Sequence, residues 1–374
     1  MAKHMFLRTT IAVVWDFDST LVPGCMQEPL FRHFGVDGEQ FWKEADGLSE
    51  CYRQRGVTRK SKDTLYLNHI LAYVRAGRFA GLNNRKLRKL GSKLEFYPGL
   101  PDFFPRITER IATNSRFAKH QIAVEHYIVS AGLREMIMGS SIAPHVDEVW
   151  ACEFAESSAA PGYLEKPSAL FDEGAGVLCE VAYAVDNTSK TRAMFEINKG
   201  YNKFSEIDVN ATIAEDIRRV PFQNMVYIGD GPSDVLCFSL VGGFGGRTYA
   251  VYEPRSDKEF QKAYDLRKQQ RVEAFGEADY SDSSHTAMWI TKAVEDIAER
   301  IVRDRERMLG DELGRHPGNV MEQPTAARAE GSIAPEREMP ELIEARREPS
   351  APKKASGVVR TAKTKADNPE AARS

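Results

Sequence analysis

Four short apolar runs, each followed at once by small or polar residues, set the hydrophobic pattern of the first 300 residues. Continuous runs of this kind, rich in β-branched residues, are typical of strands that are buried on both faces of a parallel sheet. Segments with helical patterns lie between them, for example residues 100–112 and 189–199. Alternating strands and helices predict a doubly wound, Rossmann-like α/β fold. The four predicted strands are residues 11–15, 127–129, 225–228 and 248–252.

The long segment between the first and second runs predicts an inserted domain. Residues 24–96 are rich in helix formers and poor in β-branched runs, so we expect an α-helical cap there. The catalytic core would then comprise residues 9–23 and 97–304. Lys and Arg number 14 in the predicted cap, against 8 Asp and Glu, so the cap is basic.

The C-terminal part of the chain has a different composition. From residue 305 to residue 374 there is no Phe, Trp or Tyr, and Pro, Ala, Glu, Arg and Lys dominate. Such a segment cannot bury enough apolar surface to offset the entropy lost on ordering. We therefore expect residues 312–374 to be a disordered, solvated tail.

Asp16 and Asp18 stand two positions apart, directly after the first apolar run. Where a chain leaves the sheet, two such carboxylates can face one site. One can attack an electrophile while the other transfers protons, which is the division of labour that covalent catalysis requires. Taken alone, the pair fits equally well a turn whose aspartates bind nearby backbone groups.

A second acidic pair, Asp230 and Asp234, follows residues 225–228 in the segment Gly-Asp-Gly-Pro-Ser-Asp. Carboxylates at this point could complete the oxygen-rich shell that Mg²⁺ prefers. By itself the segment also fits a Gly-Pro turn with a helix N-cap at Ser233 or Asp234.

Two weaker signals concern phosphate binding. Ser130, Ala131 and Gly132 follow the run 127–129, and a hydroxyl with successive backbone N–H groups at a strand end can hold a phosphate. Lys190 opens a predicted helix, although a lone lysine at a helix start is usually solvated. The nearby alternatives for a phosphate-site lysine are Lys199 and Lys203.

The order of these motifs resembles that of the haloacid dehalogenase (HAD) superfamily over about residues 9–300. Residues 16–21, Asp-Phe-Asp-Ser-Thr-Leu, look like the first motif of its phosphoserine-phosphatase-like branch, and residues 227–234 look like the fourth. That branch carries a helical cap between its first and second motifs, where the basic insertion lies here.

The resemblance implies a phosphatase that hydrolyses a small phosphomonoester through an aspartyl-phosphate. Asp16 would be the nucleophile and Asp18 the general acid and base. The phosphoryl group would be bound by Ser130, Ala131, Gly132 and Lys190. Mg²⁺ would be bound by Asp16, Asp18 (through its backbone carbonyl), Asp230 and Asp234. Acidic groups beside a phosphate dianion repel one another in a cleft of low dielectric constant, so the cation and the lysine are both needed.

Two other functions remain open at this stage. A phosphotransferase would use the same intermediate with an acceptor alcohol in place of water. A non-catalytic binding protein could keep the fold and act through its tail, although the complete set of acidic motif residues disfavours it.

The substrate of such an enzyme would be a small phosphorylated metabolite. Phosphoserine or a phosphorylated amino alcohol is expected from the branch, while a nucleotide or sugar phosphate remains open. The cap would select it. A basic segment could bind a second anionic group or could be a solvated helix face: Arg53, Arg55, Arg59, Lys60 and Lys62. Three aromatic residues could pack a ligand or form the cap core: Phe41, Trp42 and Tyr52.

Charge and composition exclude several other classes of protein. The net charge is −3 and the pI about 6.3, so no nucleic-acid partner is expected. The five scattered cysteines form no CxxC pair, which disfavours a disulfide framework or a zinc site. The sequence contains no run of ~18 apolar residues, the length that a membrane-spanning helix requires. We therefore expect a cytoplasmic protein that binds no membrane, and the sequence leaves its oligomeric state open.

Overall fold

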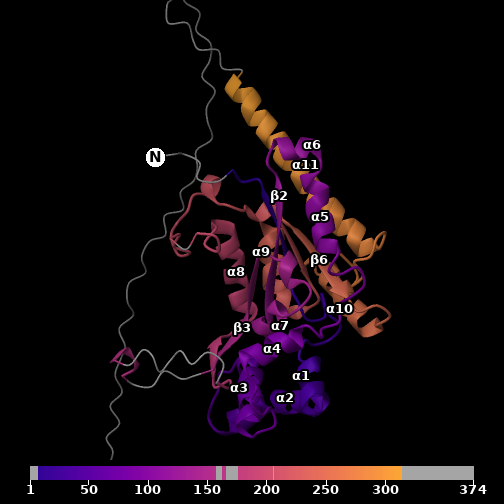
Figure 1. Ribbon diagram of the computed structural model, residues 1–374. Helices are drawn as coiled ribbons and strands as arrows, with labels where there is room; N and C mark the ends of the chain where they lie inside the picture. The colour runs from indigo at the N-terminus through magenta and orange to yellow at the C-terminus, as the bar shows by residue number, and fades with distance from the viewer. Residues whose placement is uncertain (1–6, 157–161, 166–175, 205, 314–374) are drawn as a thin grey trace, which may run out of the picture. The chain divides into compact units, whose positions relative to one another are not determined.

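Seven strands form one sheet in the part of the chain that the computed structural model describes, residues 7–156, 162–165, 176–204 and 206–313 (Figure 1). The strand order is β4-β3-β2-β1-β5-β6-β7. All neighbouring pairs are parallel except β3 and β4, which are antiparallel. The strands are β1 (Thr10–Trp15), β2 (Ala123–Leu133), β3 (Glu148–Ala155), β4 (Glu180–Tyr183), β5 (Met225–Gly229), β6 (Arg247–Tyr252) and β7 (Ala274–Glu277).

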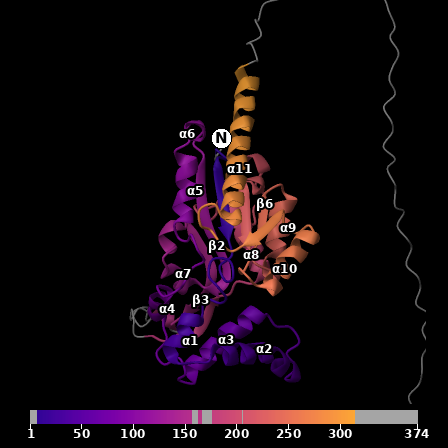
Figure 2. The same ribbon diagram turned by 90° about the vertical axis from the view of Figure 1, so that its right-hand side faces the viewer.

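The central strand β1 supplies side chains to two separate cores. Ile11, Val13 and Trp15 pack into one buried cluster, and Ala12 and Val14 into another on the opposite face. Helices cover both faces, and Figures 1 and 2 show α5 and α11 on the side opposite α8. The first cluster contains side chains from α5 (Phe103–Ala112), α6 (Ser115–Lys119), α7 (Arg134–Met138) and α11 (His285–Leu313). The second contains side chains from α8 (Asn187–Lys199), α9 (Val235–Gly243) and α10 (Asp257–Lys268). The predicted doubly wound α/β fold is therefore confirmed.

The four strands predicted from apolar runs are all present, but the sheet has three more. The prediction missed β3, β4 and β7, and the predicted parallel sheet carries one antiparallel strand, β4, at its edge. The pattern of β4 is weak because its residues are mostly solvent-exposed at the sheet edge. β7 is short and contains Gly276, where a Cβ would lie 2.3 Å from the Tyr249 hydroxyl oxygen.

Four helices lie between β1 and α5, in the segment predicted as a cap, at one end of the sheet (Figure 1). They are α1 (Glu28–Phe34), α2 (Gly38–Gln54), α3 (Lys62–Arg75) and α4 (Asn84–Gly91). Side chains of Asp37, Ser61 and Asn83 accept backbone N–H groups at the starts of α2, α3 and α4, which fixes where these helices begin. The chain returns to the core where the backbone N–H of Tyr97 donates to the Leu21 carbonyl at 3.0 Å. The insertion thus leaves and re-enters the core beside the loop that follows β1.

The last described helix is longer than expected. α11 runs from His285 to Leu313, so it extends beyond the predicted core boundary at residue 304 and includes residues 312 and 313 of the predicted tail. The remaining predicted tail, residues 314–374, lies outside the described residues. None of the described helices is long and apolar enough to cross a membrane.

We expect the buried side chain of His126 on β2 to make the stability of the fold depend on pH. Its side chain is 2% exposed, and its Nδ1 accepts a hydrogen bond from the Trp15 indole N–H at 3.3 Å. Burial lowers the pKa of His126 to about 3. Between pH 6.5 and 3 the unfolded chain would therefore bind a proton at this position that the folded chain does not. The free energy of unfolding should fall by about 1.4 kcal/mol per pH unit as the pH decreases through this range.

We expect His126→Asn, which keeps an acceptor for Trp15, to show a weaker acid dependence than the wild type. Urea denaturation between pH 7 and pH 4 measures the free energy of unfolding at each pH. His33→Gln is the control for removal of a histidine, because His33 is exposed. If the free energy of unfolding changed equally with pH in the wild type and in His126→Asn, His126 would not be the residue that titrates.

Candidate active site

The loop after β1 turns the two aspartates of the first motif toward different neighbours. Asp16 extends the pairing of β1 with β5, because its backbone N–H donates to the Ile228 carbonyl at 2.8 Å, and the residue is 5% exposed. Ser19 then adopts a positive φ of 55°, which bends the chain out of the sheet. The Asp18 carboxylate accepts the Met26 backbone N–H at 2.8 Å. Asp16 therefore lies at the strand tip, while Asp18 lies in the loop beneath the cap.

The second acidic pair lies at the tip of the adjacent strand β5. Asp234 is fully buried and accepts a hydrogen bond from the Tyr227 hydroxyl at 2.7 Å. Gly229 makes this approach possible, since a Cβ there would lie 2.4 Å from Oδ2 of Asp234. Asp230 is half-buried. β1 and β5 are hydrogen-bonded neighbours, so both acidic motifs meet at the carboxyl ends of these two strands.

Lys190 forms an ion pair with a carboxylate of each acidic motif. Its ammonium nitrogen lies 2.9 Å from Oδ1 of Asp16 and 2.8 Å from Oδ1 of Asp234, and its side chain is 1% exposed. The lysine sits in the first turn of α8, where the Asp186 side chain caps the helix by accepting the N–H groups of Thr188 and Ser189. The alternatives point elsewhere: Lys199 donates to the carbonyls of residues 209 and 211, and Lys203 pairs with Asp147.

The carboxylates of this cluster carry more negative charge than Lys190 offsets. Burial, together with the charge of Asp234, raises the pKa of Asp16 well above its usual value. The same two causes raise the pKa of Asp230 to about 7. Burial alone would lower the pKa of Lys190, but the charges of Asp16 and Asp234 outweigh it and raise the pKa. The cluster therefore favours a further cation.

The donor atoms suit a hard divalent cation. One carboxylate oxygen from each of Asp16, Asp230 and Asp234 lies within 4.8 Å of the other two. Oxygen ligands of this kind are those that Mg²⁺ binds, usually keeping several waters as well. These residues fit the magnesium site expected from the sequence. The side chain of Asp18 is not one of the three converging carboxylates.

The expected phosphate-binding residues lie at the end of β2 and not in a loop after it. Ser130 is buried, and its hydroxyl accepts the Gly132 backbone N–H at 2.9 Å. The Ala131 carbonyl accepts the hydroxyl of Tyr66, a cap residue, at 2.5 Å. Gly132 packs closely against Met26, since a Cβ there would lie 2.1 Å from the methyl carbon of that side chain, which would have to shift. The end of β2 thus contacts both the cap and the loop of the first motif.

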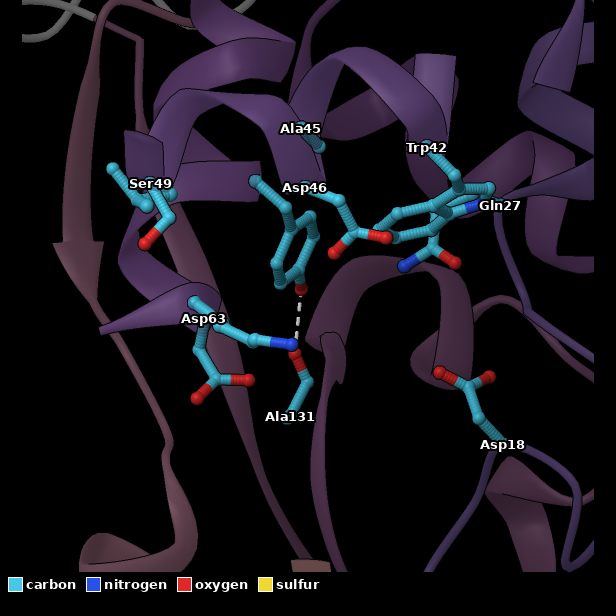
Figure 3. A pocket seen from close by; sticks show the side chains of 11 residues that line it. Asp18, Gln27, Trp42, Ala45, Asp46, Ser49, Asp63 and Ala131 are labelled. Carbon is cyan, nitrogen blue, oxygen red and sulfur yellow. Dashed lines mark hydrogen bonds between the residues drawn. The ribbon is translucent and has the colours of Figure 1, made fainter. Parts of the chain in front are cut away.

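A cavity of about 250 Å³ lies between the cap helices and the core, beside Asp18 (Figure 3). Its polar wall comes mainly from the cap, on α2 and α3. Tyr66 closes one side through its hydrogen bond to Ala131, and Trp42 and Gln27 form another. The lining residues are Asp18, Gln27, Trp42, Ala45, Asp46, Ser49, Lys62, Asp63, Leu65, Tyr66 and Ala131.

Most of this wall was missed from the sequence. Of the basic segment singled out there, only Lys62 lines the cavity; of the three aromatic residues, Trp42 lines it, while Phe41 is buried in the core. Trp42, Asp46 and Ser49 are spaced i, i+4 and i+7 on α2, so they share one helix face. That spacing was the available signal, but it equally fits a half-solvated surface.

The described residues combine a doubly wound sheet, helices inserted after β1, and acidic motifs that meet a lysine at adjacent strand ends. These features agree with the resemblance to the HAD superfamily that the motif order indicated.

A relative places the chain in a family. A protein of Borreliella burgdorferi (strain ATCC 35210 / DSM 4680 / CIP 102532 / B31), described as uncharacterized, is 40% identical over 288 residues, which cover 76% of this chain and 96% of that protein. The chain belongs to the same family as this protein. No model of a known protein family matches the sequence.

Several solved structures are similar at low sequence identity. A HAD family hydrolase from Salmonella enterica subsp. enterica serovar Typhi is 12% identical with a TM-score of 0.43, and the match covers 71% of this chain and 66% of that one. A phosphoserine phosphatase with a phospho-aspartyl intermediate analogue is 15% identical with a TM-score of 0.39, covering 71% and 93%. A probable phosphoserine phosphatase from Vibrio cholerae is 13% identical with a TM-score of 0.42, covering 79% and 68%. The chain thus spans slightly less than two thirds of the Salmonella protein.

Proposed function

We propose that this protein is a Mg²⁺-dependent phosphatase that hydrolyses a small phosphomonoester through an aspartyl-phosphate on Asp16. The observation that carries the proposal is the contact of the buried Asp16 carboxylate with Lys190 at 2.9 Å, within a cluster that also contains Asp230 and Asp234. A carboxylate at a strand tip, held by a cation and two residues from the cavity-lining Asp18, is placed to act as a nucleophile.

In the first step, a carboxylate oxygen of Asp16 forms a bond to phosphorus as the bond from phosphorus to the leaving oxygen breaks. Asp18 gives its proton to that leaving oxygen. In the second step, water attacks the phosphorus of the aspartyl-phosphate while Asp18 takes a proton from the water. The bond between the Asp16 oxygen and phosphorus breaks, which releases inorganic phosphate and restores the Asp16 carboxylate and the protonated Asp18.

The surroundings of Asp18 support its role as acid and base. Burial raises its pKa to about 6, against the opposing effect of the hydrogen bond from the Met26 backbone N–H. A general acid works best when its pKa lies near the working pH. Asp18 also lines the cavity, so a leaving group held there would lie beside it.

The remaining residues would bind and orient the phosphoryl group. We assign its oxygens to Ser130 and the backbone of Ala131 and Gly132, and charge neutralisation of the Asp16 carboxylate to Lys190. Asp16, Asp230 and the Asp18 backbone carbonyl would hold Mg²⁺, with Asp234 supporting the metal and Lys190. When bound, Mg²⁺ supplies positive charge that offsets the phosphate and the nearby carboxylates. Positioning and charge stabilisation then supply most of the rate enhancement.

The proposal is tested by hydrolysis of a chromogenic phosphate ester. We expect turnover with Mg²⁺, its loss after treatment with EDTA, and its return when Mg²⁺ is added again, because the acidic cluster would otherwise repel the phosphate. Thermal denaturation in EDTA serves as the control that the protein stays folded. Activity that is unchanged by EDTA would contradict the role of the metal, and absence of activity on a broad panel of phosphomonoesters would contradict the function.

A further inference from the structure

The wall of the cavity beneath the cap is acidic, although the cap as a whole is basic. Besides Asp18, which the proposed mechanism requires in its protonated form, two carboxylates line it, those of Asp46 and Asp63, against a single cationic side chain, Lys62. Asp46 and Lys62 are solvent-exposed and Asp63 is half-buried. Arg53, which was expected to bind an anionic group, pairs instead with Glu50 on the same helix. The charge of the wall therefore favours a cationic ligand over a second anionic group.

Two buried polar atoms in the same wall lack a hydrogen-bond partner among the described residues, the amide oxygen of Gln27 and the indole N–H of Trp42. Gln27 is 2% exposed, and its Oε1 accepts no hydrogen bond from any described residue. Figure 3 shows Gln27 among the residues that line the cavity. A buried acceptor that stays unpaired costs free energy, so this position favours a ligand that donates hydrogen bonds. An ammonium group does so.

Aromatic rings complete the same wall. Trp42 lines the cavity and packs against Tyr66, with ring centroids 5.6 Å apart. Indole is the ring that attracts a cation most strongly. Burial, together with the charge of Asp186, raises the pKa of Asp63, so a positive charge near Asp63 would relieve an unfavourable environment. Carboxylates, an unpaired amide and an indole are thus gathered where a leaving group would lie.

We infer that this cavity selects phosphomonoesters whose leaving group carries a positively charged amine, as in a phosphorylated amino alcohol. The inference rests on the proposed function, because it assigns the cavity to the leaving group. Asp46 and Asp63 attract the ammonium, and Gln27 accepts a hydrogen bond from it. A leaving group that adds a carboxylate, as phosphoserine does, faces repulsion from the same two aspartates, so the structure favours the amino alcohol of these two expected substrates.

Two esters of nearly equal size test this assignment: ethanolamine phosphate and ethylene glycol monophosphate, which differ by an ammonium in place of a hydroxyl. We expect the full-length protein to show a kcat/KM at least about tenfold higher for ethanolamine phosphate. Phosphoserine, which adds a carboxylate, should be the poorer of the two amine-bearing esters.

Substitutions in α2 test whether the cavity causes the preference for the amine-bearing ester. Asp46→Asn should lower kcat/KM for ethanolamine phosphate by about fivefold, because an exposed ion pair contributes roughly 1 kcal/mol, and should lower the value for the glycol ester by a smaller factor, so that the ratio of the two values falls. Glu50→Gln is the matched control, since Glu50 lies on the same helix but does not line the cavity. It should change neither value. A loss of the same size in Glu50→Gln would mean that the charge of the whole cap, and not the cavity, causes the preference.

Binding separates this inference from the proposed function. Calorimetric titration of the Asp16→Asn protein, which should not turn over, gives the affinity for both esters. Tighter binding of ethanolamine phosphate by a protein that hydrolyses no ester at all would support the cavity assignment and contradict the phosphatase function. Equal affinities and equal kcat/KM values in an active enzyme would overturn the cavity assignment alone. Absence of both binding and hydrolysis would overturn both.

Discussion

Replacing Asp16 by asparagine is expected to lower kcat for a phosphomonoester by at least about 10⁴-fold, because losses of that order follow removal of a covalent nucleophile. The amide that takes its place is a poor nucleophile toward phosphorus. It also removes one of the three carboxylates available to the metal. Steady-state hydrolysis of a chromogenic ester measures the effect, and Asp102→Asn is a matched control because Asp102 is exposed outside the site.

The same substitution should not destabilise the fold. An asparagine side chain fills the same volume and can still accept a hydrogen bond from Lys190. Because burial and Asp234 raise the pKa of Asp16, its charged form is unfavourable in the folded protein, and a neutral amide relieves part of that cost. The melting temperature in EDTA should therefore equal or exceed that of the wild type. An Asp16→Asn protein that is folded and still active would contradict the covalent mechanism.

Secondary structure was predictable where burial leaves an uninterrupted apolar run, as in β1 and β5. β2 shows the limit. Residues 127–129 were predicted, yet the strand spans Ala123–Leu133. Polar residues interrupt its pattern, but His126 is buried against Trp15, and Glu125 is paired with Arg219, which lies far along the chain. Such long-range partners cannot be read from a local pattern.

The acidic residues of the site were predictable for a geometric reason. The carboxyl ends of neighbouring parallel strands lie at the same end of a sheet, so aspartates that follow two such strands are brought together there. Lys190 is different, since its position depends on how α8 starts. The Asp186 cap begins the helix with Lys190 in its first turn, which directs the lysine to Asp16 and Asp234.

The remaining contacts of the site depend on tertiary structure. Tyr227 was interpreted as part of a strand and as the first residue of the fourth motif, with no contact assigned to its side chain, yet its hydroxyl donates a hydrogen bond to Asp234. The cavity wall depends on how the cap docks, through contacts such as that of Tyr66 with Ala131. A sequence pattern gives the face of α2 that carries Trp42 and Asp46, but not what that face meets.

Replacing Lys190 by methionine is expected to destabilise the metal-free protein by about 3–5 kcal/mol and to abolish phosphatase activity. Methionine fills a similar volume, so the loss is one of charge. It leaves Asp16 and Asp234, 5% and 0% exposed, buried without their cation, and removal of one partner from a buried ion pair has a cost of this size. Urea denaturation in EDTA measures the free energy of unfolding.

The control for this change is Lys199→Met. Lys199 lies on the same helix, but it donates to two backbone carbonyls and not to a carboxylate. We expect that variant to lose only about 1–3 kcal/mol and to stay active. A Lys190→Met protein as stable as the wild type would show that the two carboxylates are not both charged when the protein is folded.

A double variant separates stability from catalysis. In Lys190→Met/Asp234→Asn, one of the unpaired buried charges is gone, while the Tyr227 hydroxyl can still donate to the new amide oxygen. Stability should therefore recover by about half of the loss caused by Lys190→Met. Activity should not recover, because the Asp16 carboxylate would still lack the cation that offsets its charge beside a phosphate. Recovery of both properties together would mean that Lys190 acts only by neutralising Asp234, and that Asp16 can attack without it.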